Sequence, residues 1–81
     1  MSSTRHNQDP ARCRRRRVEA GLSQIHFARQ VGVSKGHMSL VESGRRGASP
    51  ALLGRMAAVL GCEISDLMPP MPEQTLTGSR A

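Results

Sequence analysis

The chain has 81 residues, which is enough for one domain with a small hydrophobic core. Hydrophobic residues make up 37% of it, aromatic residues 1%, and 12 Lys and Arg oppose 6 Asp and Glu, for a net charge of +6. This excess favours a polyanionic partner. Because the sequence contains no long apolar run and no apolar segment near its start, we expect neither a membrane span nor a secretory signal.

The N-terminal part is predicted to be a polar arm followed by a basic helix. Residues 1–9 show no hydrophobic periodicity, and we expect them to be disordered. Pro10 suits the entry to a helix, which is predicted over residues 11–20 and is closed by Gly21.

Three further helices are predicted, each with a Ser before its first residue and a Gly after its last. A Ser before each helix can accept a hydrogen bond from a free backbone N–H, and a Gly after it can adopt the left-handed backbone conformation. The predicted helices cover residues 24–31, 35–43 and 50–60, between the caps Ser23 and Gly32, Ser34 and Gly44, and Ser49 and Gly61.

The C-terminal part is predicted to end the fold. Residues 64–68 can form one further helical turn, which Pro69 and Pro70 stop, and residues 69–81 read as a flexible tail. No segment shows the alternation typical of a strand. The fold class is therefore predicted to be all-α, with one compact domain of four to five helices over residues 10–68.

The stretch 23–43 predicts a helix-turn-helix. Only residues 32–34 separate its two short helices, and such a link forces a steep crossing. Ala28 provides the small side chain where the helices approach each other. The remaining inward positions are predicted to be core, namely Phe27, Val31, Val33, Met38 and Val41.

Motifs in a fixed order, without a gap, extend this pattern over residues 12–68. They are Arg14 and Arg17, GLSQ at 21–24, FA at 27–28, VGVS at 31–34, VESGRR at 41–46, Ser49, Leu53, Met56-Ala57, Val59-Leu60-Gly61, Ile64 and Asp66-Leu67. In this order they resemble the lambda-repressor-like, Cro/CI-type (Xre) helix-turn-helix family. The resemblance implies a lambda-repressor-like fold and binding to double-stranded DNA.

By this resemblance, the helix over residues 35–43 would enter the major groove. Lys35 can donate to guanine, Gly36 allows close approach, and Leu40 can contact a thymine methyl or instead lie at the edge of the core. The candidate base contacts are Gln24, Lys35, Gly36, Ser39, Leu40 and Ser43.

A second set of residues is expected at the DNA backbone, where contacts position the protein without reading sequence. The candidates are Arg14, Arg15, Ser34, His37, Arg45 and Arg46. Two alternatives stay open: Ser34 can be an N-cap only, and the Arg run over residues 14–17 can be a solvated face.

The resemblance also implies a structural ion pair between Arg17 and Glu42 that orients the helix over residues 35–43. Other positions depart from the family pattern and affect the choice of operator more than the fold. These are Arg16, Ile25, Gly36, Leu40 and Ala48.

The function predicted from the sequence is that of a bacterial or phage DNA-binding transcriptional regulator, a dimeric repressor located in the cytoplasm at the nucleoid. Residues 60–72, with Leu67, Met68 and Met71, are candidates for the dimer contact, as is the loop before residue 50. Two alternatives are an antitoxin, which would also bind a toxin protein, and a protein-interaction module on the same fold. Cys13, Cys62 and the His residues match no metal-site spacing, so we expect no cofactor, metal or enzymatic activity.

Overall fold

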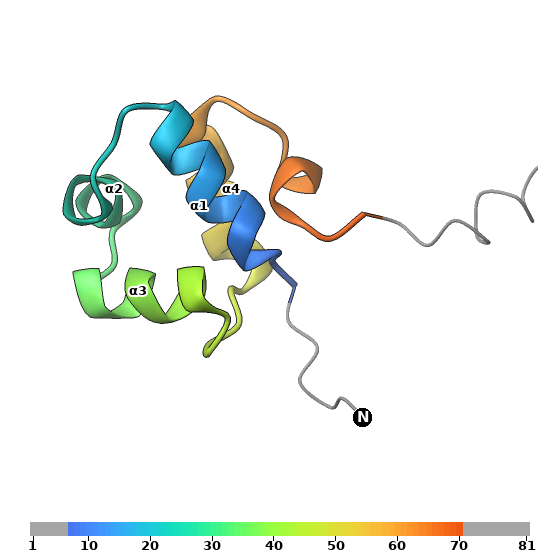
Figure 1. Ribbon diagram of the computed structural model, residues 1–81, viewed down its shortest axis with the longest axis horizontal. Helices are drawn as coiled ribbons and strands as arrows, with labels where there is room; N and C mark the ends of the chain where they lie inside the picture. Colours follow the sequence, from blue (N-terminus) through green and yellow to red (C-terminus); the bar gives the residue numbers. More distant parts are fainter. Residues whose placement is uncertain (1–6, 71–81) are drawn as a thin grey trace, which may run out of the picture.

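The computed structural model describes residues 7–70, and within this range it contains helices and no strand (Figure 1). None of the helices in this range is long and apolar enough to cross a bilayer. In chain order the elements are α1 (Pro10–Glu19), α2 (Gln24–Val31), α3 (Lys35–Ser43), α4 (Pro50–Leu60) and the 3-10 helix η1 (Ile64–Leu67).

The bounds of α2, α3 and α4 agree with those predicted, and the reason is local. The N-cap hydroxyls of Ser23, Ser34 and Ser49 each accept a hydrogen bond from the backbone N–H three residues later. At the other ends the chain turns through Gly residues with positive φ, which side chains with a Cβ disfavour. These φ angles are 93° at Gly32, 80° at Gly44 and 70° at Gly61.

Helix α1 differs from the prediction at both ends by one residue. Asp9 caps it, since its carboxylate accepts from the backbone N–H groups of Ala11 and Arg12, and the helix begins at Pro10. It ends at Glu19, and the left-handed Gly21 lies beyond the C-cap Ala20. An Asp cap followed by Pro is the same start signal as the Ser49-Pro50 pair that opens α4.

The predicted disordered arm is wrong for residues 7–9, which contact the domain. The side chain of Asn7 donates to the carbonyl of Ala48, Gln8 is buried, and the Asp9 N–H donates to the carbonyl of Leu67 at 2.8 Å. These polar groups are ordered by partners that lie 33 or more residues away in the sequence. Residues 1–6 of the predicted arm lie outside the described residues.

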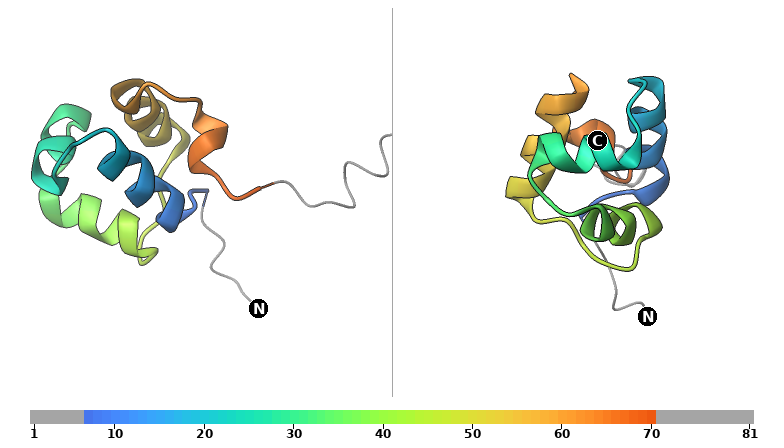
Figure 2. Two further views of the ribbon diagram at one scale, coloured as in Figure 1. Left: turned by 45° about the horizontal axis from the view of Figure 1, so that its top comes forward. Right: turned by 90° about the vertical axis from the view of Figure 1, so that its left-hand side faces the viewer.

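Buried residues of all the helices form one core, and Figure 2 shows how the helices are arranged around it. The predicted core residues of α2 and α3 are buried, whereas Val33 in the turn between them is half-buried. Helix α1 contributes little apolar area to the core, because Cys13 is its one buried residue. The buried hydrophobic residues are Cys13, Phe27, Ala28, Val31, Met38, Val41, Ala48, Leu52, Leu53, Met56, Ala57 and Leu67.

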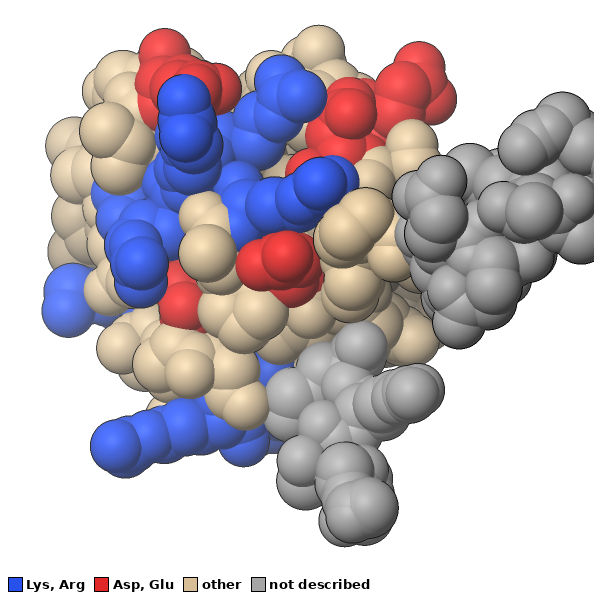
Figure 3. Space-filling view, turned by 45° about the vertical axis from the view of Figure 1, so that its right-hand side comes forward, with Lys and Arg blue, Asp and Glu red and all other residues tan. Residues whose placement is uncertain are grey.

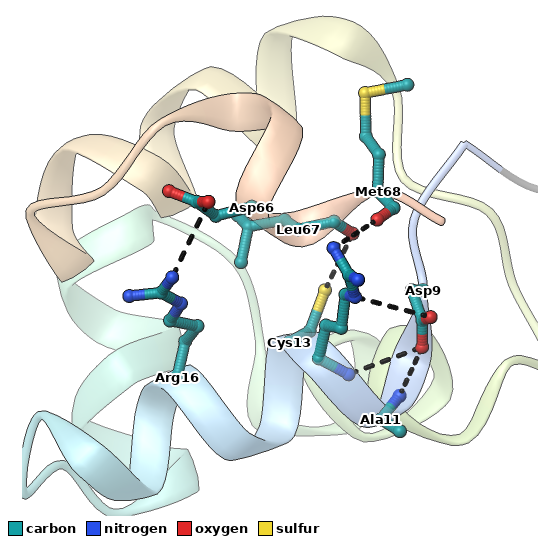
Figure 4. A network of polar contacts seen from close by, with 8 residues as sticks. Asp9, Ala11, Cys13, Arg16, Asp66, Leu67 and Met68 are labelled. Atoms are coloured by element: carbon teal, nitrogen blue, oxygen red, sulfur yellow. Dashed lines mark hydrogen bonds and ion pairs between the residues drawn. The ribbon is translucent and has the colours of Figure 1, made fainter. Parts of the chain in front are cut away.

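Element η1, at the C-terminal end of the domain, contacts α1 (Figure 4). The Cys13 thiol lies 3.8 Å from the carbonyl of Leu67, and Arg16 pairs with Asp66 at 3.5 Å. Leu67 is fully buried, so the expectation that it contributes to a dimer contact is wrong. Met68 is half-buried, and Met71 lies outside the described residues.

Candidate nucleic-acid interface

One side of α3 is open to solvent and the other is anchored in the core. Successive residues are about 100° apart around a helix, so Gly36, Ser39, Leu40 and Ser43 share one side. All four are exposed, as is Lys35 at the start of the helix. Leu40 exposes 38% of its surface, so this large apolar side chain remains accessible to a partner.

Two hydroxyls proposed for DNA contact already have partners within the protein. The Ser34 hydroxyl accepts from the His37 N–H at 3.0 Å as the N-cap of α3, and the Ser43 hydroxyl donates to the Leu40 carbonyl at 3.1 Å. A hydroxyl has further hydrogen-bonding capacity, so these bonds leave room for a phosphate or base. They also give each Ser a structural role that does not depend on DNA.

Arg17 and Glu42 form an ion pair that joins α1 to α3. The guanidinium Nε lies 2.8 Å from one carboxylate oxygen of Glu42 and Nη2 lies 3.1 Å from the other, in the two-bond geometry that Arg favours with carboxylates. Nη1 of Arg17 also donates to the Leu22 carbonyl at 2.9 Å. Only 3% of the Glu42 side chain and 13% of the Arg17 side chain are exposed.

The same carboxylate holds Gln24, the first residue of α2. The side-chain amide of Gln24 donates to Glu42 at 3.1 Å and is half-buried. Gln24 is therefore oriented by α3 before any ligand is present. A base contact by Gln24 would use its amide oxygen or its second amide N–H, or would exchange this bond.

The loop after α3 carries Arg45 and Arg46, both exposed. Their backbone N–H groups both donate to the Leu40 carbonyl, at 3.0 and 3.2 Å, which closes the end of α3. A Cβ on Gly44 would lie 3.1 Å from Cγ of Pro10, so the N-terminal end of α1 fits closely against this turn. The two cations thus extend from a turn with a defined backbone.

The Arg residues of α1 divide between two sides of the helix. Arg14 lies within about 60° of Arg17, on the side that faces α3, whereas Arg15 lies about 160° from Arg17. Arg15 is 81% exposed and pairs with Glu19 at 3.0 Å. The structure therefore separates Arg14 from Arg15, although the sequence predicts both as phosphate contacts.

The side of α1 that carries Arg15 is a mixed surface of both charges. A shallow pocket of about 340 Å³ is lined by Arg12, Arg15, Arg16, Glu19 and Asp66. Figure 3 shows the basic and acidic side chains side by side on this face. Because acids are interleaved with the cations, this surface attracts a polyanion less than the α3 side does.

Two residues of the interface region carry no recognisable signal in the sequence, namely Asn7 and Gln8. Both bond to the segment after α3, and Gln8 has 2% of its surface exposed. Ala48, which departs from the family pattern, has the N–H that donates to Gln8 at 2.9 Å. Only the tertiary contact assigns a role to these residues.

Both thiols are held in the protonated form. Burial, followed by the negative charge of Glu42, raises the pKa of Cys13 from 9.0 to about 12. Burial also raises the pKa of Cys62, while Arg16 opposes that rise. Since the thiolate is the reactive form, neither thiol is activated as a nucleophile.

We expect iodoacetamide at pH 8 to modify Cys62 first and Cys13 only when the domain unfolds. Because the pKa of Cys13 is higher in the folded protein, its protonated thiol contributes to stability below pH 9.0. This contribution is lost as the pH rises from 9.0 to about 12. Mass spectrometry of labelled peptides, with and without guanidinium, measures both rates. Equal labelling of the two thiols in the native protein would contradict the burial of Cys13.

Comparisons with known proteins agree with this geometry. Residues 11–67 match the family model described as a helix-turn-helix domain. A search of the curated proteins finds no match.

Similar solved structures include three bacterial proteins. One is the restriction-modification controller protein C.AhdI from Aeromonas hydrophila, with 30% identity, a TM-score of 0.70 and coverage of 73% of this chain and 89% of that one. A second is the hypothetical transcription factor NHTF from Neisseria, with 34% identity, a TM-score of 0.70 and coverage of 84% and 77%. The clp gene regulator ClgR from Corynebacterium glutamicum has 32% identity, a TM-score of 0.68 and coverage of 70% of this chain, which spans 61% of ClgR.

Proposed function

Because the chain belongs to the helix-turn-helix domain family, we propose that it is a sequence-specific transcriptional regulator that binds double-stranded DNA through α3. The observation that carries this proposal is the exposed side of α3, with Lys35 at one end and Arg45 and Arg46 just beyond the other. An α-helix of this kind fits the major groove of B-DNA. Binding and occlusion of DNA need no catalytic step.

Sequence would be read by side chains on the exposed side of α3. Lys35 can donate to guanine O6 and N7, and Leu40 can contact the methyl group of thymine. Gly36 has no side chain and would let the helix approach the bases. Gln24, Ser39 and Ser43 complete the proposed base-contacting set.

Backbone contacts would come from cations on either side of α3 and from the helix N-termini. Arg14, Arg45 and Arg46 are exposed around the α3 side, and Ser34 and His37 lie at the N-terminus of α3, where backbone N–H groups favour an anion. We exclude Arg15 from this proposed set, because it lies on the opposite side of α1 in a pair with Glu19.

A single copy offers a small footprint, so we propose a homodimer that represses by covering two half-sites in the cytoplasm. The centres of such half-sites would be about 34 Å apart, one turn of DNA. Ile64, 41% exposed, is an accessible apolar side chain within the proposed contact segment, residues 60–72. The half-buried Met68 lies in the same region.

Selection of bound sequences from a random duplex pool at physiological salt tests the proposal. Recovery of an inverted repeat with half-sites one turn apart is the expected result. Recovery of no motif would overturn sequence-specific regulation. Purification of the chain with a stoichiometric protein partner would instead favour the antitoxin or the interaction module.

Lys35→Ala is expected to remove the preference for one base without lowering the melting temperature, because this side chain is exposed. Loss of one good base contact should reduce discrimination by about 1–3 kcal/mol. Selection with the variant and with Lys35→Arg as a control measures this effect, since Arg retains the ability to bind guanine. An unchanged motif from Lys35→Ala would show that Lys35 reads no base.

A further inference from the structure

The segment before α1 is bonded to the loop that follows α3. The Gln8 amide nitrogen donates to the carbonyls of Arg46 at 2.7 Å and Val41 at 3.1 Å, and its oxygen accepts from the Ala48 N–H at 2.9 Å. Asn7 adds a bond to the Ala48 carbonyl at 2.9 Å. Figure 1 shows this segment entering α1 beside the chain that leads from α3 to α4.

Gln8 itself is shielded from water, since 2% of the residue is exposed; its bonds to Val41 and Ala48 are buried and its bond to Arg46 is partly buried. The Val41 carbonyl lies in the last turn of α3 and already accepts from the Gly44 N–H at 3.2 Å, so Gln8 adds a second bond to it. A buried polar group without a partner is costly, so the buried Ala48 N–H favours the loop position that reaches Gln8, and the bond to the Arg46 carbonyl favours the same position. One side chain therefore defines where the loop lies relative to α1.

Pro10 restrains the same loop from the side of α1. Gly44 has a φ of 80°, and a Cβ there would come within 3.1 Å of Pro10 Cγ. The turn at Gly44 thus lies close to Pro10, and the carbonyl of Arg46 is bonded to Gln8, so both meet residues that precede or open α1.

We propose that Gln8 is a positioning residue for DNA binding: it fixes the loop over residues 44–48 and so sets where Arg45 and Arg46 meet the DNA backbone. The inference rests on the proposed function. Gln8 bonds directly to the backbone of Arg46 and to the Ala48 N–H two residues further on. Cations on a loop that is already ordered lose less conformational entropy on binding than cations on a loose loop.

The test replaces Gln8 with Met, which has a similar length and no strong hydrogen-bonding group. Affinity for the selected DNA is measured as a function of salt at a temperature where the variant is folded by circular dichroism. We expect weaker binding and a salt slope reduced by up to about 4 per dimer, one for each phosphate contact that Arg45 and Arg46 of the two protomers lose. Asn7→Ala, a milder change at an exposed residue, should act in the same direction with a smaller effect.

Val59→Ala, in the half-buried part of α4, is the control for a general loss of stability. It should lower the melting temperature while leaving the salt slope unchanged. The Gln8→Met change should also cost less than about twofold in affinity when Arg45 and Arg46 are both already Ala, because it acts through them.

Two results would overturn the inference while leaving the proposed function intact. One is Gln8→Met with the affinity and salt slope of the wild type. The other is an equal fold-loss from Gln8→Met with and without Arg45 and Arg46. Failure of the wild-type protein to bind any duplex DNA would overturn both proposals together.

Discussion

Replacing Glu42 with Ala should lower the free energy of unfolding by about 3 kcal/mol, the lower end of the range for breaking a buried ion pair. The carboxylate is 3% exposed and holds both Arg17 and Gln24. Its removal leaves the Arg17 guanidinium, 13% exposed, with the Leu22 carbonyl as its partner. Thermal unfolding should show a melting temperature lower by more than about 10 °C for a domain of this size.

Two controls separate the buried pair from charge in general. Arg15→Ala breaks the exposed pair with Glu19 and should cost no more than about 0.5 kcal/mol. Replacing Arg17 with Met and Glu42 with Leu together removes both charges, so this variant should be more stable than Glu42→Ala. A melting temperature of Glu42→Ala equal to that of the wild type would disprove the structural role of the pair.

Binding to the selected DNA should weaken about 10³-fold when salt rises from 50 to 200 mM, if six phosphates are contacted per dimer. The six contacts are those proposed for Arg14, Arg45 and Arg46 of each protomer, all exposed. Each contact releases counterions from the duplex, so the logarithm of the binding constant falls steeply with the logarithm of salt concentration. Fluorescence anisotropy with labelled duplex measures the slope.

Arg46→Ala and Arg15→Ala form a matched pair for this experiment, because each removes one exposed cation. Arg46→Ala should reduce the slope by about 2 per dimer. Arg15→Ala should leave it almost unchanged, since Arg15 pairs with Glu19 on the other side of α1. Equal effects of the two substitutions would show that binding depends on net charge and not on the α3 side.

The helices that the sequence predicts best are those whose ends are defined by neighbouring residues. The bounds of α2, α3 and α4 follow from Ser caps and left-handed Gly residues within each segment. The start of α1 could have been found in the same way, because Asp9-Pro10 has the same cap-and-proline order. The end of α1 could not, since Ala20 caps it and Gly21 follows one residue later.

The same distinction between local and long-range features applies to the candidate site. Exposure of Gly36, Ser39 and Leu40 follows from helical periodicity, which the sequence displays directly. The bond between Gln24 and Glu42 and the burial of Leu67 depend on how separate helices meet. No periodic pattern reports such contacts.

The number and order of the helices, the fold class and the solvent-facing side of α3 follow from the sequence alone, because short-range capping and periodicity are encoded within a few residues. Which polar residues become fixed parts of the domain depends instead on tertiary contacts. Gln8 lies in a polar segment without hydrophobic periodicity. It is buried because it bonds to three backbone groups, which lie 33 to 40 residues further along the chain. Such long-range bonds exist only once the core has brought α1 and α3 together.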